Sequence, residues 1–238
     1  MSTLYITGAG VSAESGIPTF RGEDGYWTIG SQNYTPQQMA TRAMYEQNPA
    51  EFLTWYYKRF VTYRNHGPND VHRWLADKTL ITQNIDGLDG KAGNNDYISI
   101  HGRIDEVTLF HTQGEEVMRN KAPWHLVDES NLTASLLDVF QIPKNGPELN
   151  VSLKPYVLLF DEYYTELYQI NKAQEQMQQA HRMVFIGTSF SVNITNMALD
   201  IARANQIPVE VVDPQPNAVF YSNVEYHQMT AKEYINRS

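Results

Sequence analysis

A glycine-rich turn directly after a short apolar run constrains the fold of this chain more than any other feature. Residues 7–16 read Thr-Gly-Ala-Gly-Val-Ser-Ala-Glu-Ser-Gly, and they follow the apolar run Leu4–Thr7. Gly8, Gly10 and Ala13 match a dinucleotide-binding fingerprint, in which small residues bring backbone N–H groups against a pyrophosphate at a helix N-terminus. An ordinary glycine-rich strand-to-helix turn is the alternative.

Short apolar runs alternate with helix-like stretches along the rest of the chain. The further expected strands are Thr79–Gln83, Tyr97–Ile100, Val157–Phe160, Met183–Gly187 and Val209–Val212. The expected helices begin at Pro49 and cover Thr165–Ala180 and Ile194–Ala204. Apolar runs without alternation are typical of buried parallel strands. The pattern therefore predicts an α/β fold, a Rossmann-like doubly wound parallel sheet.

Two segments interrupt this alternation. Residues 22–48 are rich in Gly, Ser, Thr, Gln and Asn, which predicts a long mobile loop, and residues 103–153 are weakly periodic, which predicts a lid or an inserted module. We expect one catalytic unit over residues 1–238. Its core would comprise about 1–30, 75–102 and 154–238, and its inserted modules about 31–74, which is helical, and about 103–153.

Composition excludes several classes of function. The 238 residues include no cysteine, which excludes disulfides, iron–sulfur clusters, a thiolate nucleophile and cysteine-ligated zinc. A net charge of −9 argues against nucleic acid as a partner. No signal peptide is readable and the apolar runs are too short for a membrane span, so we expect a cytoplasmic protein without membrane contact. The oligomeric state stays open.

The residues after the glycine turn do not favour a hydride-transfer enzyme. A dehydrogenase carries an acidic residue about 20 residues after its fingerprint, at the end of a second strand. Here Glu23 and Asp24 lie in loop-like sequence instead.

The same residues resemble the signature of the sirtuins, which are NAD-consuming lysine deacylases. The matching segments are Gly8–Arg21 (GAGVSAESGIPTFR), Thr82–Leu88 (TQNIDGL), Lys91–Gly93, His101–Gly102, Gly187–Ser189 and Val209–Pro214. They follow the family's order and approximate spacing from residue 4 to about 217. The resemblance implies a Rossmann-like fold and NAD as co-substrate.

The resemblance also implies roles for individual residues. The NAD-binding set would be Gly8, Ala9, Gly10, Ser12, Ser15, Ile17, Phe20, Arg21, Gln83, Gly187, Thr188, Ser189 and Asp213. Asp86 would hold the nicotinamide carboxamide, Asn84 would orient the ribose or a water, and His101 would be the general base. Taken alone, His101 is a polar residue after a strand and Arg21 is a surface arginine.

Two helix residues suggest an acyl preference. Tyr56 and Arg59 fall where the succinyl- and malonyl-removing sirtuins carry a Tyr-x-x-Arg pair. At this spacing the side chains share a helix face, and a guanidinium suits a carboxylate-tipped chain. The alternative is a helix that buries Tyr56 and exposes Arg59.

The segment Lys154–Glu162 resembles the family strand whose backbone pairs with an acyl-lysine protein or peptide. Leu158 and Phe160 would line this substrate groove. The family usually has glycine where this chain has Asp161, and we expect this departure to narrow the peptide groove.

Residues 103–153 lack the four cysteines that hold zinc in the family's small domain. We expect no metal there, and a module held together by apolar side chains. These are Ile104, Val107, Leu109, Phe110, Trp124, Leu126, Leu136, Leu137, Val139 and Phe140. Asp89 and Ile194 stand where a histidine and a proline are usual, so details of the NAD pocket are open.

Three functions therefore compete. An NAD-dependent protein-lysine deacylase, acting on acetyl or on succinyl and malonyl groups, leads. A sirtuin-like NAD glycohydrolase or ADP-ribosyltransferase is second, and a non-catalytic sensor of NAD or ADP-ribose is third. Asn84, Asp86 and His101 together argue against the sensor, which needs little beyond the glycine turn.

Overall fold

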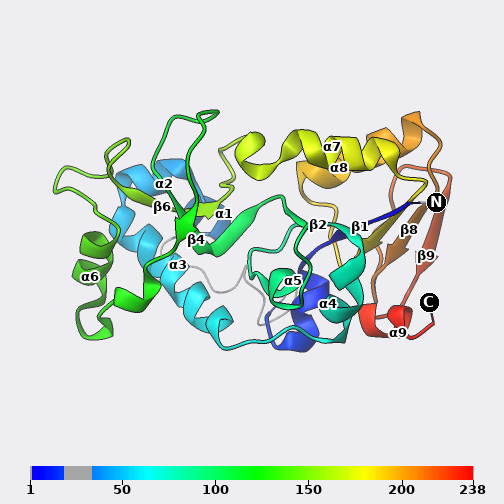
Figure 1. The fold of residues 1–238 in the computed structure, drawn as a ribbon, viewed down its shortest axis with the longest axis horizontal. Helices are drawn as coiled ribbons and strands as arrows, with labels where there is room; N and C mark the ends of the chain where they lie inside the picture. The colour runs from blue at the N-terminus through cyan, green and yellow to red at the C-terminus, as the bar shows by residue number, and fades with distance from the viewer. Residues whose placement is uncertain (1, 19–33, 238) are drawn as a thin grey trace.

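The computed structural model describes residues 2–18 and 34–237. Six parallel strands form the main sheet, in the order β3-β2-β1-β7-β8-β9 (Figure 1). Their bounds are β1 Thr3–Thr7, β2 Thr79–Thr82, β3 Ile98–Ser99, β7 Arg182–Ile186, β8 Val209–Val212 and β9 Val224–His227. The strand order reverses between β1 and β7, as in a doubly wound dinucleotide-binding sheet. The predicted Rossmann-like fold is confirmed.

Helices cover both faces of this sheet. On one face, α7 (Ile170–Gln179) and α8 (Asn193–Ala204) pack against Leu4 and Ile6 of β1. On the other, α4 (Asp70–Trp74) and α9 (Ala231–Ile235) pack around Tyr5 (Figure 1). Burial of alternate side chains on opposite faces explains why these strands read as continuous apolar runs.

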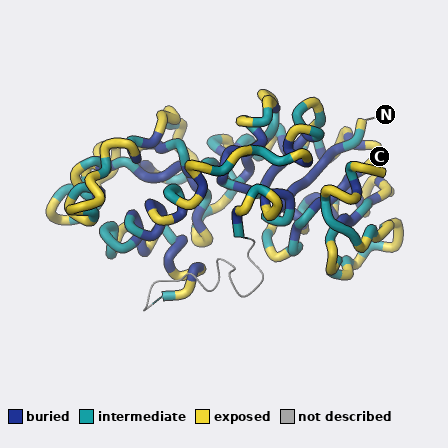
Figure 2. The backbone as a smooth tube through the Cα atoms, turned by 90° about the horizontal axis from the view of Figure 1, so that it is seen from below, coloured by how far each residue is buried: buried dark blue, intermediate teal, exposed yellow. Residues whose placement is uncertain are grey.

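A second body lies at the end of the molecule away from the two termini (Figure 1). Its three-stranded antiparallel sheet has the order β5-β4-β6, with β4 Gly102–Leu109, β5 Asn120–Lys121 and β6 Leu153–Val157. Its helices are α1 Pro36–Met39, α2 Arg42–Gln47, α3 Pro49–Arg64 and α6 Leu132–Val139. Buried residues run through this body as well as through the main sheet (Figure 2).

Short helices complete the described chain. They are α5 Leu88–Lys91 and the 3-10 helices Ala9–Ser15, Leu75–Asp77, Trp124–Leu126, Glu129–Asn131 and Glu166–Tyr168. Across residues 2–18 and 34–237, every helix is too short or too polar to span a bilayer.

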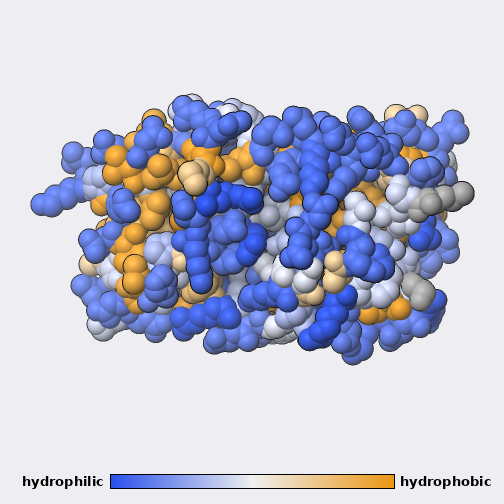
Figure 3. Space-filling model, viewed as in Figure 1, coloured by the Kyte–Doolittle hydropathy of each residue, from blue (hydrophilic) through white to orange (hydrophobic). Residues whose placement is uncertain are grey.

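The second body has a continuous apolar core. Trp124 is 2 % exposed, its indole Nε1 donates to Ile104 O at 2.7 Å, and its ring packs on Phe60 and Phe140. Within the described residues, no group of three or more His, Asp or Glu side chains is arranged to hold a metal ion. Some apolar side chains reach the surface around β4 and α6, whereas the surface over α7 is hydrophilic (Figure 3).

One expected strand and one expected loop differ from the structure. The strand expected at Val157–Phe160 lies earlier, at Leu153–Val157, and pairs antiparallel with β4 outside the main sheet. An apolar run alone does not distinguish a strand from an irregular segment with one buried side. The loop expected over residues 22–48 contains α1 and α2, which begin at side-chain caps from Thr35 and Thr41; residues 22–33 lie outside the described residues.

The expected helix Thr165–Ala180 is divided into the 3-10 helix Glu166–Tyr168 and α7. The division falls at Gln169, whose φ of 57° is left-handed and ends one helix before the next begins.

Candidate functional site

The glycine turn after β1 interlocks with the turn after β7. Gly8 N donates to Ile186 O and Gly10 N donates to Gly187 O, each at 3.0 Å. A Cβ at Gly10 would lie 2.5 Å from the Cα of Gly187, and Gly187 itself has a φ of +61°. Only glycine allows this approach of two backbones at the point where the strand order reverses.

The turn continues as a 3-10 helix, Ala9–Ser15, rather than the α-helix that the fingerprint predicts. Ser12 points into the protein and is 1 % exposed, and Ile17 is 4 % exposed. Ser15 Oγ is buried and has no hydrogen-bond partner among the described residues. A buried hydroxyl without a partner in such a turn is free to bind a polar ligand atom.

Asp86, Asn84 and Ser12 form one buried hydrogen-bond cluster. Ser12 Oγ donates to Asp86 Oδ2 at 2.7 Å, and Leu88 N donates to Asp86 Oδ1 at 2.9 Å. Asn84 Nδ2 donates to Gly8 O at 3.0 Å and to Ser12 Oγ at 3.2 Å. The cluster therefore joins the segment after β2 to the glycine turn.

His72 extends this cluster, and the sequence did not identify it. Its Nδ1 accepts from Asn69 N at 3.3 Å, so Nε2 carries the proton and faces Ser12 Oγ at 3.4 Å. Burial lowers the pKa of His72, with the Asp86 carboxylate opposing that shift. The only signal in the sequence is the helix-capping spacing of Asn69 and His72.

His101 lies at the carboxyl end of β3, next to the same cluster. Its Nδ1 faces Gln83 O at 3.1 Å and its Nε2 faces the Tyr164 hydroxyl at 3.0 Å. Burial lowers the pKa of His101 to about 4, although the Gln83 carbonyl favours the charged form. The imidazole is neutral near pH 7 and able to accept a proton.

Gln83, Thr188 and Gly187 connect β2 to the turn after β7. Gln83 Nε2 donates to Thr7 O and to Thr188 Oγ1, both at 3.1 Å. Further along this edge, Ser189 Oγ contacts Ser191 Oγ at 2.8 Å, and Asp213, just after β8, accepts from Gln215 N at 2.8 Å.

Tyr56 and Arg59 are both buried on α3, at 2 % and 7 % exposed, so Arg59 is not the solvated residue of the alternative interpretation. The Arg59 guanidinium lies over the Trp55 ring, 3.0 Å from its centroid. Burial raises the pKa of Tyr56 above its usual range, so its hydroxyl stays protonated.

The segment after β6 uses its backbone N–H groups within the chain. Leu158 N donates to His101 O at 3.0 Å, Leu159 N to Glu162 Oε2 at 3.0 Å and Phe160 N to Ala40 O at 2.9 Å. Asp161 accepts from the N–H groups of Arg42 and Ala43, at 2.6 and 3.1 Å, and so ties this segment to α2.

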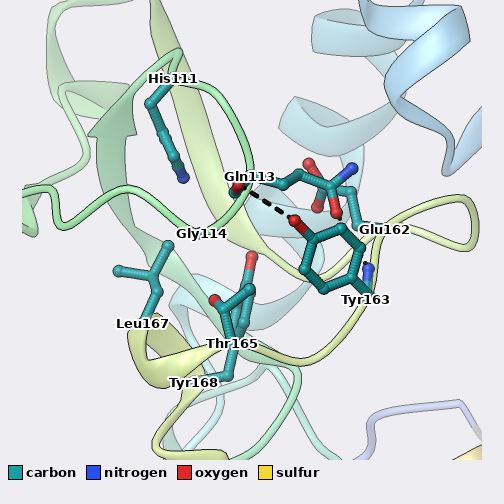
Figure 4. Close-up of a pocket in the computed structure, with 8 residues that line it drawn as sticks. All are labelled: His111, Gln113, Gly114, Glu162, Tyr163, Thr165, Leu167 and Tyr168. Atoms are coloured by element: carbon teal, nitrogen blue, oxygen red, sulfur yellow. Dashed lines mark hydrogen bonds between the residues drawn. The ribbon is translucent and has the colours of Figure 1, made fainter.

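A small pocket lies beside this segment (Figure 4). His111, Gln113 and Gly114 line one side, and the other side is lined by Glu162, Tyr163, Thr165, Leu167 and Tyr168. Tyr163 Oη donates to Gln113 O at 3.0 Å. None of the described residues predicted to bind NAD lines it. Phe20 and Arg21, predicted to bind NAD, lie outside the described residues.

The structure thus brings together residues from four distant segments. Ser12, Asn84, Asp86, His101 and Gly187 meet where ligands bind in open α/β sheets, beyond the carboxyl ends of the strands. The assembly offers a turn without side chains, a carboxylate acceptor and a neutral imidazole base.

Comparison with known proteins agrees with this geometry. The sequence profile of the Sir2 family matches residues 8–194. An NAD-dependent protein deacylase 1 of Caldanaerobacter subterraneus is 30% identical over 98% of this chain and 90% of its own length. An NAD-dependent protein deacylase of Aeropyrum pernix is 31% identical over 98% and 89%.

Among solved structures, a mutant Sir2 homologue in complex with ADP-ribose superposes with a TM-score of 0.77 at 26% identity, covering 99% of this chain and 89% of that one. Because the profile covers most of the chain and relatives align along nearly all of it, this chain belongs to the Sir2 family, the sirtuins.

Proposed function

We propose that this protein is an NAD-dependent protein-lysine deacylase, which transfers an acyl group from lysine to ADP-ribose and releases nicotinamide. The observation that carries the proposal is the meeting of Asp86, Asn84 and His101 beside the glycine turn. Names and complexes of the related Sir2 proteins support it.

The residues present fit NAD. Gly8, Gly10 and Gly187 leave a turn without side chains, which lets a pyrophosphate approach the backbone closely, and the unpartnered Ser15 hydroxyl suits a phosphate or ribose oxygen. Ala9, Ile17, Gln83, Thr188, Ser189 and Asp213 complete the proposed set, together with Phe20 and Arg21.

Each polar residue of the cluster has a proposed task. Asp86, oriented by Ser12 and Leu88 N, accepts from the carboxamide of nicotinamide. Asn84 orients the ribose or a water, since its amide neither gains nor loses a proton. His101 is the base that finally holds the proton of a ribose hydroxyl, at Nε2, because Nδ1 is committed to Gln83 O.

For the acyl group we propose a preference for succinyl and malonyl chains. Tyr56 and Arg59 are buried one helical turn apart, and stacking on Trp55 orders the guanidinium before an acyl carboxylate arrives. Leu158 and Phe160 would flank the acyl-lysine peptide.

We also propose the organisation expected from the sequence: an NAD-binding core with inserted modules at about 31–74 and 103–153, the latter held without zinc. The contacts of Trp124 support a metal-free module. The cytoplasm as its compartment stays a prediction.

An NAD glycohydrolase is the second candidate. A peptide that adds as a strand needs backbone groups at the edge it joins. The N–H groups of Leu158, Leu159 and Phe160 are already bonded within the chain, and Asp161 anchors the segment to α2. This favours NAD cleavage without a peptide.

One experiment separates these functions. The protein is incubated with NAD, alone or with acetyl-, succinyl- or malonyl-lysine peptide, and nicotinamide and the ADP-ribose product are measured. Peptide-dependent release with O-acyl-ADP-ribose is the expected result. Release without peptide would instead establish a glycohydrolase, and NAD binding without release would establish a sensor.

A further inference from the structure

The base nitrogen of His101 already has a partner in this chain. Tyr164 lies in the segment between β6 and the 3-10 helix Glu166–Tyr168, and its hydroxyl is 3.0 Å from His101 Nε2. The two rings are nearly parallel, with 21° between their planes and 6.0 Å between their centroids. The contact joins residues 63 positions apart and was not expected from the sequence.

The direction of this hydrogen bond is set by the other ring nitrogen. His101 Nδ1 is 3.1 Å from Gln83 O, and a carbonyl oxygen only accepts. Nδ1 therefore carries the proton of the neutral imidazole, and Nε2 presents a lone pair. Tyr164 must donate its hydroxyl proton to that lone pair.

The first turn of α8 also acts on the phenol oxygen. The backbone N–H of Ile194 in that turn, where N–H groups have no acceptor within the helix, lowers the pKa of Tyr164 against the effect of burial. The phenol oxygen keeps its lone pairs as acceptors while its proton is donated to Nε2. The positive end of α8 also stabilises negative charge that develops on this oxygen.

The single lone pair of Nε2 cannot bind Tyr164 and a substrate hydroxyl at the same time. We propose that Tyr164 and His101 act as a proton-transfer dyad, in which a ribose hydroxyl gives its proton to Tyr164 Oη while Tyr164 gives its own proton to His101 Nε2. This inference rests on the proposed deacylase function.

The transfer balances within the three groups. The substrate O–H bond breaks as a new Oη–H bond forms, and the original Oη–H bond breaks as an Nε2–H bond forms. Tyr164 ends as a phenol, His101 as an imidazolium and the ribose oxygen as the nucleophile. Burial raises the pKa of Tyr164 to about 12, so the two protons move together and no free phenolate accumulates.

Tyr164→Phe tests the dyad, because it removes the hydroxyl and keeps the ring that stacks on His101. Tyr163→Phe is the matched control. It removes the hydroxyl of the neighbouring tyrosine, which donates to Gln113 O and does not contact His101. We expect acyl transfer to ADP-ribose to fall about 10²-fold in Tyr164→Phe, as for loss of an acid–base group, and to stay within about twofold of wild type in Tyr163→Phe.

Rates in mixtures of H₂O and D₂O separate a relay from a structural effect. Two protons in flight give a curved dependence on the deuterium fraction in the wild type, and one proton gives a straight line in Tyr164→Phe. Activity in Tyr164→Phe equal to or above the wild-type level would overturn the dyad, since the phenol would then only mask the base.

If the wild type shows no acyl transfer, the proposed deacylase function is refuted. The contact between Tyr164 and His101 can still be tested in that case by nitrogen-15 spectra of His101 recorded without substrate. We expect protonated Nδ1, unprotonated Nε2 and a pKa that rises by about one unit in Tyr164→Phe, because a donor to Nε2 stabilises the neutral ring. A proton on Nε2 of the wild type, or an unchanged pKa in the variant, would refute the dyad.

Discussion

At the scale of one side chain, we expect Arg59 to select the acyl group by binding its carboxylate. Arg59→Met keeps much of the packing on Trp55 and removes the charge. We expect desuccinylation and demalonylation to fall about 10–100-fold and deacetylation to change little, because a hydrogen bond to a charged group contributes about 1.5–3 kcal/mol. The measurement is kcat/KM for each acyl-lysine peptide.

The matched control is Arg64→Met on the same helix, where the arginine is 39% exposed and pairs with Glu129. Arg64→Met should leave kcat/KM unchanged for the succinyl-, malonyl- and acetyl-lysine peptides. Equal losses on succinyl and acetyl peptides in Arg59→Met would show that Arg59 supports the fold of α3 and does not select the acyl group.

Asp89 gives the protein a stability that depends on pH. Asp89 is 1 % exposed, and burial, with the Asp86 charge, raises its pKa to about 7. The folded state therefore holds a proton that the unfolded state loses near pH 4, so the free energy of unfolding falls as pH rises from about 4 to 7.

Asp89→Asn removes this titration. The difference in unfolding free energy between the variant and the wild type should grow by about 2–4 kcal/mol from pH 4 to pH 8 in favour of the variant. Urea unfolding across this range measures it, with exposed Asp138→Asn as control. Parallel pH profiles for wild type and Asp89→Asn would refute the assignment.

Side chains whose partners lie far away along the chain could not be predicted from the sequence. Asp86, Asn84 and His101 were predicted because each lies in a short motif after a strand. His72 and Tyr164 reach Ser12 and His101 only through tertiary contacts 60 and 63 residues away along the chain. No local pattern encodes such a contact, so only folding reveals it.

At the scale of elements, we expect apolar packing to stabilise the second body without a metal ion. Trp124→Phe removes the donor to Ile104 O and leaves a buried carbonyl unsatisfied, which costs about 1–3 kcal/mol and lowers the Tm by several degrees. A chelator should leave the Tm of the wild type unchanged.

Trp55→Phe is the control for that substitution, because Trp55 Nε1 finds no acceptor among the described residues. It should cost less stability than Trp124→Phe. A Tm that falls on adding the chelator, or stoichiometric zinc in the purified protein, would show that a metal stabilises the module.

The same scale shows which elements a sequence predicts. Strands buried on both faces, such as β7 and β8, were found within one residue of their bounds. β9 (Val224–His227) was missed, since it lies at the sheet edge and carries exposed Glu225 and Tyr226. The β6 segment was misplaced because Leu158 and Phe160 are apolar but lie beyond the end of the strand.

At the scale of the whole molecule, the parallel sheet brings motifs that are far apart in the sequence together in one site. β1, β2, β3 and β7 are neighbours in the sheet and point the same way, so the turns after them meet at one edge. Family motifs were therefore sufficient to predict this edge. The contacts of the segment after β6 were not predictable, because Asp161 meets Ala43, and Phe160 meets Ala40, only across the second body.

A ligand that binds this edge must stabilise the folded chain as a whole. NAD at 100 times its Kd should raise the unfolding free energy by about 2.7 kcal/mol, and the Tm by roughly 5–10 °C for a chain of this size. Gly10→Ala should abolish the shift, because its Cβ would lie 2.5 Å from the Cα of Gly187 and force the two turns apart.

Gly67→Ala is the matched control, since a Cβ there meets nothing within 4 Å, and it should keep both the basal Tm and the NAD shift. Trp124→Phe should lower the basal Tm and keep the shift, because its packing defect lies away from the interlocked turns. An NAD shift of wild-type size in Gly10→Ala would mean that NAD does not bind between the turns after β1 and β7. The family motif would then mark a structural junction, and the co-substrate site would have to be sought elsewhere on the chain.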